Sequence, residues 1–284
     1  MNRMPITATC FCAFLTTVEL AQGDFIFDDF GSPSGLVLNG DAAPSSGILR
    51  LTPSAYATRG SAWFAAPQLV EYGFLTSFQF RISDLGGRFN DILGNPGADG
   101  FAFVIQNSGV TALGAPGGGM GYGGDAQIPG IANSLAVEFD TWFNPASETN
   151  DPNGNHLSVH TRGVLPNSAH HNFSIGVTTS VPDFSDGNVH NVIIRYVPGS
   201  LSVYVDDLMS PRLTVATDLT KTLALSDGTA LVGFTSSTFN AWENHDIVSW
   251  RFTAAVPEPS SAVVVCVGGI VFFVRRRKNL TRVD

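Results

Sequence analysis

Two carboxylates follow an apolar run in the middle of the chain. Glu138 and Asp140 come directly after Leu135-Ala136-Val137 and flank Phe139. In a β-strand, residues two apart share a face, so we expect Glu138 and Asp140 to project together and Phe139 to point the other way. Adjacent carboxylates repel each other, and burying them unpaired is costly unless a cation or a proton is present. The spacing therefore predicts a cation-binding pair on one face of a strand.

The segment after this pair adds the remaining donors of a metal site. Asn144 and Asp151 supply oxygen atoms, and His156 begins the next predicted strand with an imidazole. Oxygen ligands suit Ca²⁺, whereas a mixed carboxylate and imidazole set suits a transition ion such as Mn²⁺. We expect one cluster with ligands for two ions, which share Asp140 and Asp151. The alternative is a solvated acidic turn, because Asp-Pro-Asn-Gly at 151–154 is also ordinary turn chemistry.

The order of these residues resembles the metal-binding motif of legume-type (L-type) lectins, which are concanavalin-like sandwich proteins. The family pattern is Glu-x-Asp-x-aromatic-x-Asn, a loop, Asp-Pro and then His, and the matching positions are Glu138, Asp140, Trp142, Asn144, Asp151-Pro152 and His156. The resemblance implies ligation of an Mn²⁺-type ion by Glu138, Asp140, Asp151 and His156. It implies ligation of Ca²⁺ by Asp140, Asn144, Asp151 and the backbone carbonyl of Trp142. The loop between Asn144 and Asp151 is longer than in plant members.

Two other motifs occur in the order that this family has. Ala98-Asp99-Gly100 resembles the motif in which an aspartate, often preceded by a cis peptide bond, accepts hydrogen bonds from sugar hydroxyls; alone, it would indicate a hairpin turn. The stretch Gly117–Gly124 resembles the family's glycine-rich loop, and implies that the backbone N–H of Gly119 approaches the sugar. A flexible linker is the alternative for this stretch. A phosphate-binding loop is excluded, because the Gly-Lys-Ser/Thr ending is missing.

A variable loop completes the sugar site that the resemblance implies. Residues 239–244 lie between segments that resemble the lectin strands Val-Gly-Phe-Ser and Ser-Trp-x-Phe. The sugar-binding residues implied are Asp99, Gly119, Trp142, Asn144, Phe239 and Asn240. In this arrangement Ca²⁺ does not touch the sugar but holds Asn144 and Trp142 in place. Trp142 would stack on the apolar face of a pyranose, and the Asn144 amide would donate to a hydroxyl.

Short β-branched or alternating runs separated by turn residues fill residues 24–254. The predicted strands are 47–52, 75–82, 101–105, 135–139, 156–160, 189–196, 201–205, 231–234 and 246–252. The best helix candidate, Asp218 to Leu225, is short. Many strands without helices between them indicate one all-β antiparallel sandwich. The family resemblance specifies a concanavalin A-like jelly roll.

Composition narrows the function of this domain. The 284-residue chain has a net charge of −9, and residues 24–256 hold nine Lys/Arg against 21 Asp/Glu. A general nucleic-acid binder needs a basic surface, so that class is excluded. The three cysteines, Cys10, Cys12 and Cys266, lie outside this region. Cysteine nucleophiles, Cys-ligated zinc and iron–sulfur clusters are therefore excluded within it.

The two ends of the chain have the patterns of targeting segments. Residues 1–23 combine Arg3, an apolar run and a small-residue site, as in a secretory signal peptide. Residues 255–284 contain Pro257-Glu258-Pro259, a short apolar run and a basic cluster, and resemble the PEP-CTERM sorting signal. This resemblance implies a bacterial protein that is exported, transiently anchored in the membrane, handled by an exosortase-type enzyme, and released or attached at the cell surface. The alternative is a plain tail anchor.

We expect a non-enzymatic domain that binds a glycan or an exopolysaccharide, either as a monomer or as a homo-oligomer. A glycoside hydrolase of the same fold would carry Glu-x-Asp-x-x-Glu, but the last position here is Phe143. A Ser-His-Asp hydrolase lacks its Gly-x-Ser-x-Gly signature. His170, His171 and His190 are expected in loops or on strand surfaces, and His245 in solvent. The strongest alternative is a structural or adhesive module of the same fold without sugar binding.

Overall fold

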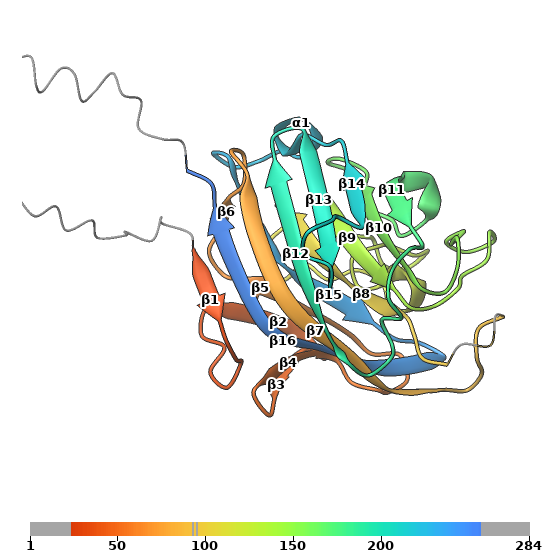
Figure 1. Ribbon diagram of the computed structural model, residues 1–284. Coiled ribbons are helices and arrows are strands. Elements are labelled where there is room, and N and C mark those ends of the chain that lie inside the picture. The colour runs from red at the N-terminus through yellow and green to blue at the C-terminus, as the bar shows by residue number, and fades with distance from the viewer. Residues whose placement is uncertain (1–23, 93, 95, 257–284) are drawn as a thin grey trace, which may run out of the picture.

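Two curved antiparallel sheets pack face to face in the computed structural model (Figure 1), which describes residues 24–92, 94 and 96–256. The predicted signal peptide (1–23), residues 257–284 of the predicted sorting segment, and the three cysteines lie outside the described residues. Among the residues that are described, no helix has the length and apolar character needed to cross a bilayer.

Each sheet has eight strands. The first sheet contains, in spatial order, β14 (Leu213–Val215), β13 (Ser200–Val205), β12 (Val189–Val197), β7 (Phe74–Gly87), β16 (Ala241–Ala254), β4 (Ile48–Thr52) and β3 (Ala43–Ser45), and β1 (Phe25–Phe27) pairs with β16. The second contains β11 (Ser174–Thr178), β10 (His156–Thr161), β9 (Ser134–Asp140), β8 (Gly100–Gln106), β15 (Thr229–Ser237), β5 (Arg59–Phe64) and β2 (Leu36–Gly40), and β6 (Gln68–Leu69) pairs with β15. The predicted all-β antiparallel sandwich is confirmed.

Every predicted strand overlaps an observed one, and the helix candidate is real but short. The α-helix α1 (Leu219–Thr222) begins after Asp218, whose side chain accepts the backbone N–H of Thr220. Two 3₁₀ turns, η1 (Gly117–Gly119) and η2 (His171–Phe173), complete the elements of the described chain. The strands that were not predicted are mostly brief or at sheet edges, such as β11, whose residues are all at least partly exposed.

Aromatic side chains from both sheets fill the space between them. In β7 the inward positions alternate, so that Phe78 and Phe80 are buried while their neighbours are partly exposed. The ring of Phe80 lies 4.9 Å from that of Phe101 on β8. Phe101 in turn stacks on Phe139 of β9 with centroids 4.7 Å apart. Phe139 therefore belongs to the core, as its place between two carboxylates predicted.

The second sheet is covered on its outer face as well. The segment between β8 and β9 folds back over it, and Tyr122 and Ile131 from this segment pack with Val104 and Ala136. All seven residues of β9 are consequently buried. Polar groups on the outer face of β9 are thus enclosed beneath a loop layer instead of facing solvent.

The register of three strands brings the predicted donors together. Asp140 on β9 lies opposite His156 on β10 and Gly100 on β8, and Glu138 lies opposite Ser158. Directly paired residues share a face, so these side chains all lie on the outer face at one end of the sheet. Gly100 has a φ of +122°, and a Cβ there would meet the Phe139 carbonyl oxygen at 2.2 Å, so this junction requires glycine.

Strand β16 runs from a pocket to the region where the domain begins and ends, at Asp24 and Ala254. Its last residue, Ala254, donates its backbone N–H to the Asp24 carboxylate at 3.0 Å, and β1 pairs alongside. Figure 1 shows β1 beside the C-terminal part of β16 at this edge of the sheet. The strand has 14 residues, which span about 45 Å at roughly 3.3 Å per residue. The first residue of β16, Ala241, lies next to the pocket described below.

Candidate functional site

The Glu138 carboxylate is enclosed by an aromatic hydroxyl and two imidazoles. Tyr122 donates its hydroxyl to Oε2 of Glu138, and Nε2 of His160 lies 3.4 Å from the same oxygen. Nε2 of His156 lies 3.5 Å from the other oxygen, Oε1. Although Glu138 is fully buried, its Oε1 accepts no hydrogen bond from any residue that the structure describes.

Asp140 and Asp151 are held by the backbone of the loop between them. Oδ1 of Asp140 accepts the N–H of Trp142 at 2.8 Å, and Oδ2 of Asp151 accepts the N–H of Asn144 at 2.7 Å. One ligand atom each from Asp140, Asp151 and His156 lies within 4.8 Å of the others. The structure therefore brings together the predicted ligands Glu138, Asp140, Asp151 and His156, and the backbone of Asn144 is bonded to this cluster through Asp151.

The buried carboxylates of Asp140 and Asp151 repel each other when both are ionised. Burial, followed by repulsion from Asp151 and Glu138, raises the pKa of Asp140 well above its ordinary value. Burial also raises the pKa of Asp151 to about 7, against the opposing hydrogen bond from Thr149. A divalent cation among the carboxylates would reverse this tendency and keep them ionised.

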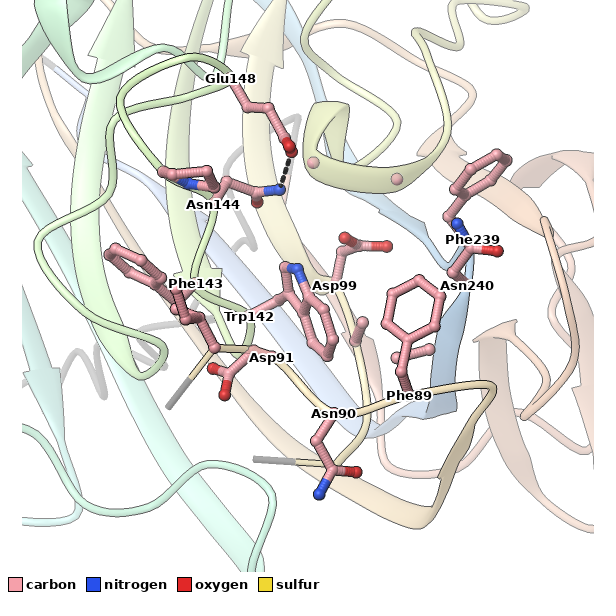
Figure 2. A pocket seen from close by; sticks show the side chains of 16 residues that line it. Phe89, Asn90, Asp91, Asp99, Trp142, Phe143, Asn144, Glu148, Phe239 and Asn240 are labelled. Carbon is pink, nitrogen blue, oxygen red and sulfur yellow. Dashed lines mark hydrogen bonds between the residues drawn. The ribbon is translucent and has the colours of Figure 1, made fainter. Parts of the chain in front are cut away.

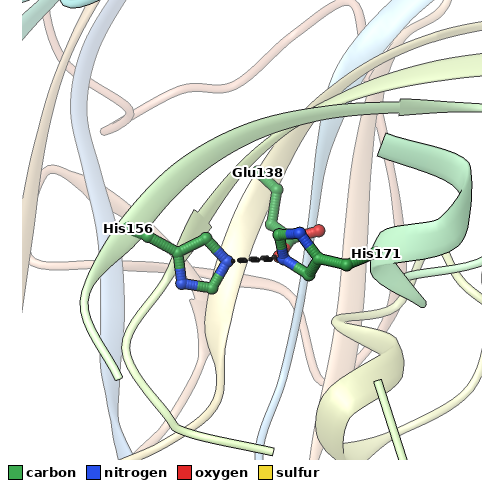
Figure 3. Close-up of side chains that lie close together, drawn as sticks. All are labelled: Glu138, His156 and His171. Atoms are coloured by element: carbon green, nitrogen blue, oxygen red, sulfur yellow. Dashed lines mark hydrogen bonds and ion pairs between the residues drawn. The ribbon is translucent and has the colours of Figure 1, made fainter. Parts of the chain in front are cut away.

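An unpredicted histidine completes the cluster (Figure 3). His171, in η2, places Nε2 at 2.9 Å from Nε2 of His156 and at 3.8 Å from Oδ1 of Asp151. The predicted loop position of His171 is confirmed, since η2 lies between β10 and β11, but its side chain is only 9% exposed and contacts the cluster. His170 lies in the loop just before η2. Burial lowers the pKa of His171 to about 4, so its imidazole is neutral at neutral pH and has a lone pair available for a metal.

The donors present fit divalent cations. Glu138, His156 and His171 form one group of potential ligands, and Asp140, Asp151 and His156 form a second. Oδ1 of Asn144 is also buried and accepts no hydrogen bond within the described chain. Unsatisfied buried oxygens are uncommon and costly, and a cation that binds them would remove the cost.

A pocket of about 410 Å³ opens beside the cluster. It contains five of the six predicted sugar-binding residues, and Figure 2 shows Asp99 between Trp142 and Asn240. The side chains and backbone that line it come from Phe89, Asn90, Asp91, Ile92, Ala98, Asp99, Gly117, Gly118, Trp142, Phe143, Asn144, Pro145, Glu148, Phe239, Asn240 and Ala241. The sequence analysis did not identify the wall formed by residues 89–92, because this mixed polar and apolar loop after β7 has no periodic pattern.

Asp99 lies at the base of the pocket. The Ala98–Asp99 peptide bond is cis, as in the motif that this segment resembles. The Asp99 backbone N–H donates to the Ser237 carbonyl at 3.2 Å, which fixes the residue to β15. Its side-chain Oδ2 is buried and has no hydrogen-bond partner among the described residues. Burial, then the charges of Glu243, Asp151 and Glu148, raises the pKa of this carboxyl well above its usual range.

The glycine-rich loop reaches the pocket through Gly117 and Gly118, while the predicted Gly119 is not among the lining residues. The Gly119 N–H faces the Pro116 carbonyl at 3.4 Å. A Cβ on Gly118 would lie 2.9 Å from Oδ1 of Asn144, so the loop packs directly on this amide. On its other side, Nδ2 of Asn144 donates to Oε2 of Glu148 at 2.8 Å (Figure 2).

The variable loop contributes an aromatic wall. Phe239 and Asn240 both line the pocket. The Phe239 ring packs against Tyr56 with centroids 5.4 Å apart, and the Arg88 guanidinium lies 4.1 Å from the centre of the Tyr56 ring. This stack fixes Phe239 at the rim of the pocket.

Two histidine predictions are wrong. His245 is fully buried and lies between Oγ1 of Thr52 at 2.7 Å and Oε1 of Glu243 at 3.2 Å, so it belongs to a polar network under the strands. His190 is also buried, because β12 turns it inward, where its ring stacks on Phe80.

Comparison with known proteins yields one family. The family model for the legume lectin beta-barrel domain matches residues 29–249. The chain is 30% identical over 251 residues to anti-H(O) lectin 1 of Cytisophyllum sessilifolium, covering 81% of this chain and 95% of that protein. Basic winged bean lectin with Tn-antigen has a TM-score of 0.64 at 27% identity, covering 82% of this chain and 98% of the other.

A second solved structure, a Bauhinia forficata lectin in complex with GalNAc, has a TM-score of 0.62 at 25% identity and covers 81% of this chain and 96% of its own. The family match thus spans both sheets, the carboxylate and histidine cluster, and the pocket beside it. The chain therefore belongs to the legume lectin (L-type lectin) family.

Proposed function

We propose that the domain binds carbohydrate in the pocket that Asp99 lines. Ca²⁺ and a transition ion, bound at the neighbouring cluster of Asp140, Asp151 and His156, would support this site. The observation that carries the proposal is a pair of buried oxygens, Oδ2 of Asp99 and Oδ1 of Asn144, which accept no hydrogen bond from the described residues. Both belong to residues that line the pocket. A sugar hydroxyl would satisfy the first oxygen, and a calcium ion the second.

The pocket offers both kinds of contact that a sugar needs. Burial and then repulsion by neighbouring carboxylates raise the pKa of Asp99, and cations bound at the neighbouring Asp151 would offset the repulsion. A carboxylate kept ionised in this way would provide charge-assisted acceptors, which are stronger than neutral ones. Trp142 and Phe239 provide apolar surface for a pyranose face, worth roughly 25 cal/mol per Å² removed from water. A single shallow site of this kind should bind weakly, on the order of 0.1–1 mM, and useful avidity would come from multivalent display, for example in a homo-oligomer.

The predicted cations would act through the loop that they hold. Bound ions would keep the carboxylates of Asp140 and Asp151 ionised. Those carboxylates accept the backbone N–H groups of Trp142 and Asn144, both of which line the pocket. The chain itself therefore links the metal cluster to the sugar site by two hydrogen bonds.

Relatives support carbohydrate as the ligand class. The solved structures of the Bauhinia forficata and winged bean lectins contain GalNAc and Tn-antigen, respectively. The activity proposed here is binding without turnover of a glycan or an exopolysaccharide. Glu138, the residue that begins the related hydrolase pattern, is fully buried and does not line the pocket.

The proposal includes export and surface display of a bacterial protein, which rest on the sequence patterns at residues 1–23 and 255–284. Processing by an exosortase-type enzyme and transient membrane attachment belong to the same proposal. Both domain ends lie at the far end of β16 from the pocket. A protein attached through its C-terminal segment would therefore present the pocket away from the attachment point.

A module without sugar binding is the second candidate, and one contact favours it. The Asn144 amide, which would donate to a sugar hydroxyl, already donates to Glu148 at 2.8 Å. In a binding site, Glu148 has to release this amide or accept a sugar hydroxyl together with it. In a purely structural module the contact would remain as it is.

A glycan array distinguishes the two candidates. The protein should be displayed at high density in Ca²⁺ and Mn²⁺, and in parallel after chelation, with its metal content measured beside each array. We expect glycan binding that chelation abolishes. Absence of binding to every glycan while both ions are demonstrably present would contradict the proposal and favour the structural module.

A further inference from the structure

The transition-ion site has one more imidazole than the set implied by family resemblance. That set consists of Glu138, Asp140, Asp151 and His156. The His171 Nε2 lies 2.9 Å from the His156 Nε2 and 3.8 Å from Oδ1 of Asp151, and His171 forms a group of potential ligands with Glu138 and His156 (Figure 3). We propose that His171 is an additional protein ligand of this ion, and that it shifts the preference of the site from Mn²⁺ toward Zn²⁺ and other ions that favour nitrogen. This inference rests on the metal-supported function proposed above.

The other contact of His156 indicates which neutral tautomer its ring adopts. Its Nδ1 lies 3.1 Å from the Asn153 carbonyl oxygen, which can only accept, so the proton belongs on Nδ1. Nε2 of His156 therefore carries a lone pair. An imidazole whose second nitrogen donates to a backbone carbonyl is the usual arrangement of a metal-ligating histidine.

The two Nε2 atoms have the separation expected for ligands of one ion. They lie 2.9 Å apart. Two nitrogens that are each about 2.1 Å from an ion are about 3.0 Å apart at a right angle and about 3.4 Å apart at a tetrahedral angle, so the observed separation is close to that of adjacent ligands. The alternative, a hydrogen bond from His171 to His156, would occupy the lone pair of His156 and leave the buried Oε1 of Glu138 without a partner. A cation between the three groups satisfies all of them.

The backbone fixes His171 in this position. Its N–H donates to the Thr149 carbonyl at 2.8 Å, which ties η2 to the loop that carries Asp151. Its side chain is only 9% exposed. An anchored imidazole of this kind takes a coordination position that water would otherwise fill. Imidazole suits Zn²⁺, Cu²⁺ and Ni²⁺, whereas oxygen ligands suit Mn²⁺. Replacing a water ligand by the His171 imidazole should therefore favour Zn²⁺ over Mn²⁺.

The neighbouring histidine provides a matched control. His170 precedes η2, and its Nδ1 accepts the Asn172 N–H at 3.1 Å, a role that asparagine can also fill. We would compare the wild type, His171→Asn, His170→Asn and His156→Asn. Each would be stripped of metal, saturated with Ca²⁺ and titrated with Zn²⁺ and with Mn²⁺ by calorimetry. Electron paramagnetic resonance of the Cu²⁺-loaded proteins would count the coordinated nitrogens.

We expect His171→Asn to weaken Zn²⁺ binding by at least about tenfold. Loss of a residue that only supports a metal ligand weakens metal affinity by about 10–100-fold, so loss of a ligand itself should cost at least the lower value. Mn²⁺ binding should weaken less, the Cu²⁺ spectrum should lose one nitrogen, and His170→Asn should match the wild type. Retained Ca²⁺ binding would show that the loop is still folded. Equal Zn²⁺ affinity and nitrogen count in the wild type and His171→Asn, with loss only in His156→Asn, would overturn this inference alone. A wild type that binds none of the three transition ions would overturn it together with the metal-supported function.

Discussion

The carboxylate of Asp140 accepts the backbone N–H of Trp142 at 2.8 Å, although the two side chains serve different sites. Asp140 lies in the buried cluster, whereas Trp142 lines the pocket. A parallel bond joins Asp151 to the backbone of Asn144. Whatever changes the charge or position of these carboxylates should therefore change the pocket.

Removal of metal should destabilise the protein. A ligand present at about 100 times its Kd stabilises the native state by about 2.7 kcal/mol, which corresponds to about 5–10 °C in a domain of this size. We expect EDTA to lower the melting temperature by this amount and to abolish glycan binding, and excess Ca²⁺ with Mn²⁺ to restore both. Scanning calorimetry with and without chelator measures the effect. An unchanged melting temperature would count against the metal site.

Asp140→Asn should change stability in opposite directions with and without metal. In chelator, the buried Asp140 carboxylate is repelled by Asp151 and Glu138, so its replacement by a neutral amide should raise the melting temperature. The amide oxygen can still accept the Trp142 N–H. In Ca²⁺ and Mn²⁺, the same substitution removes a charged ligand and should lower the melting temperature. The same sign in both buffers would show that no ion is held by Asp140.

Much of this site follows from local pattern, and its limits have physical causes. The alternation of Glu138, Phe139 and Asp140 predicts which side chains share a face, because strand geometry is periodic, and the pairing of Asp140 with His156 confirms it. The position of His171 could not be predicted in this way. It comes from a 3₁₀ turn, which has no such periodicity, and it is fixed by a tertiary hydrogen bond to Thr149.

The burial of His245 could not be predicted from its local sequence either. Its strand, β16, has polar residues at consecutive buried positions, from Glu243 to Asp246, and their partners come from distant strands. Polarity in the sequence indicated exposure, whereas a closed network with Thr52 and Ser236 makes burial possible.

Asp99→Ala should remove sugar binding and leave the metal content unchanged. The expected loss is at least about tenfold in affinity, since a hydrogen bond to a charged group contributes about 1.5–3 kcal/mol. Asp99→Asn keeps the shape and should bind with intermediate affinity. Asp29→Ala, the same substitution at an exposed position in the loop after β1, serves as the control. Calorimetry with a glycan found on the array, together with elemental analysis, checks the result. Loss of metal in Asp99→Ala would show that Asp99 belongs to the metal cluster.

Gly118→Ala should weaken sugar and Ca²⁺ binding more than Gly119→Ala. A Cβ at Gly118 would press on Oδ1 of Asn144 at 2.9 Å, whereas one at Gly119 would meet the methyl group of Ala115 at 3.0 Å. Neither glycine has a positive φ, so the comparison is free of a backbone penalty. Ca²⁺ and glycan titrations of both variants measure the difference. A larger effect at Gly119 would favour the backbone contact that family resemblance implies there.

The most direct test is the metal content of the purified protein after equilibration with Ca²⁺, Mn²⁺ and Zn²⁺ and removal of unbound ions, measured by inductively coupled plasma mass spectrometry. We predict one calcium and one transition ion per chain, and loss of both in a double variant with Asp140→Asn and Asp151→Asn. A wild-type protein that retains neither ion would contradict the idea that bound cations support the pocket.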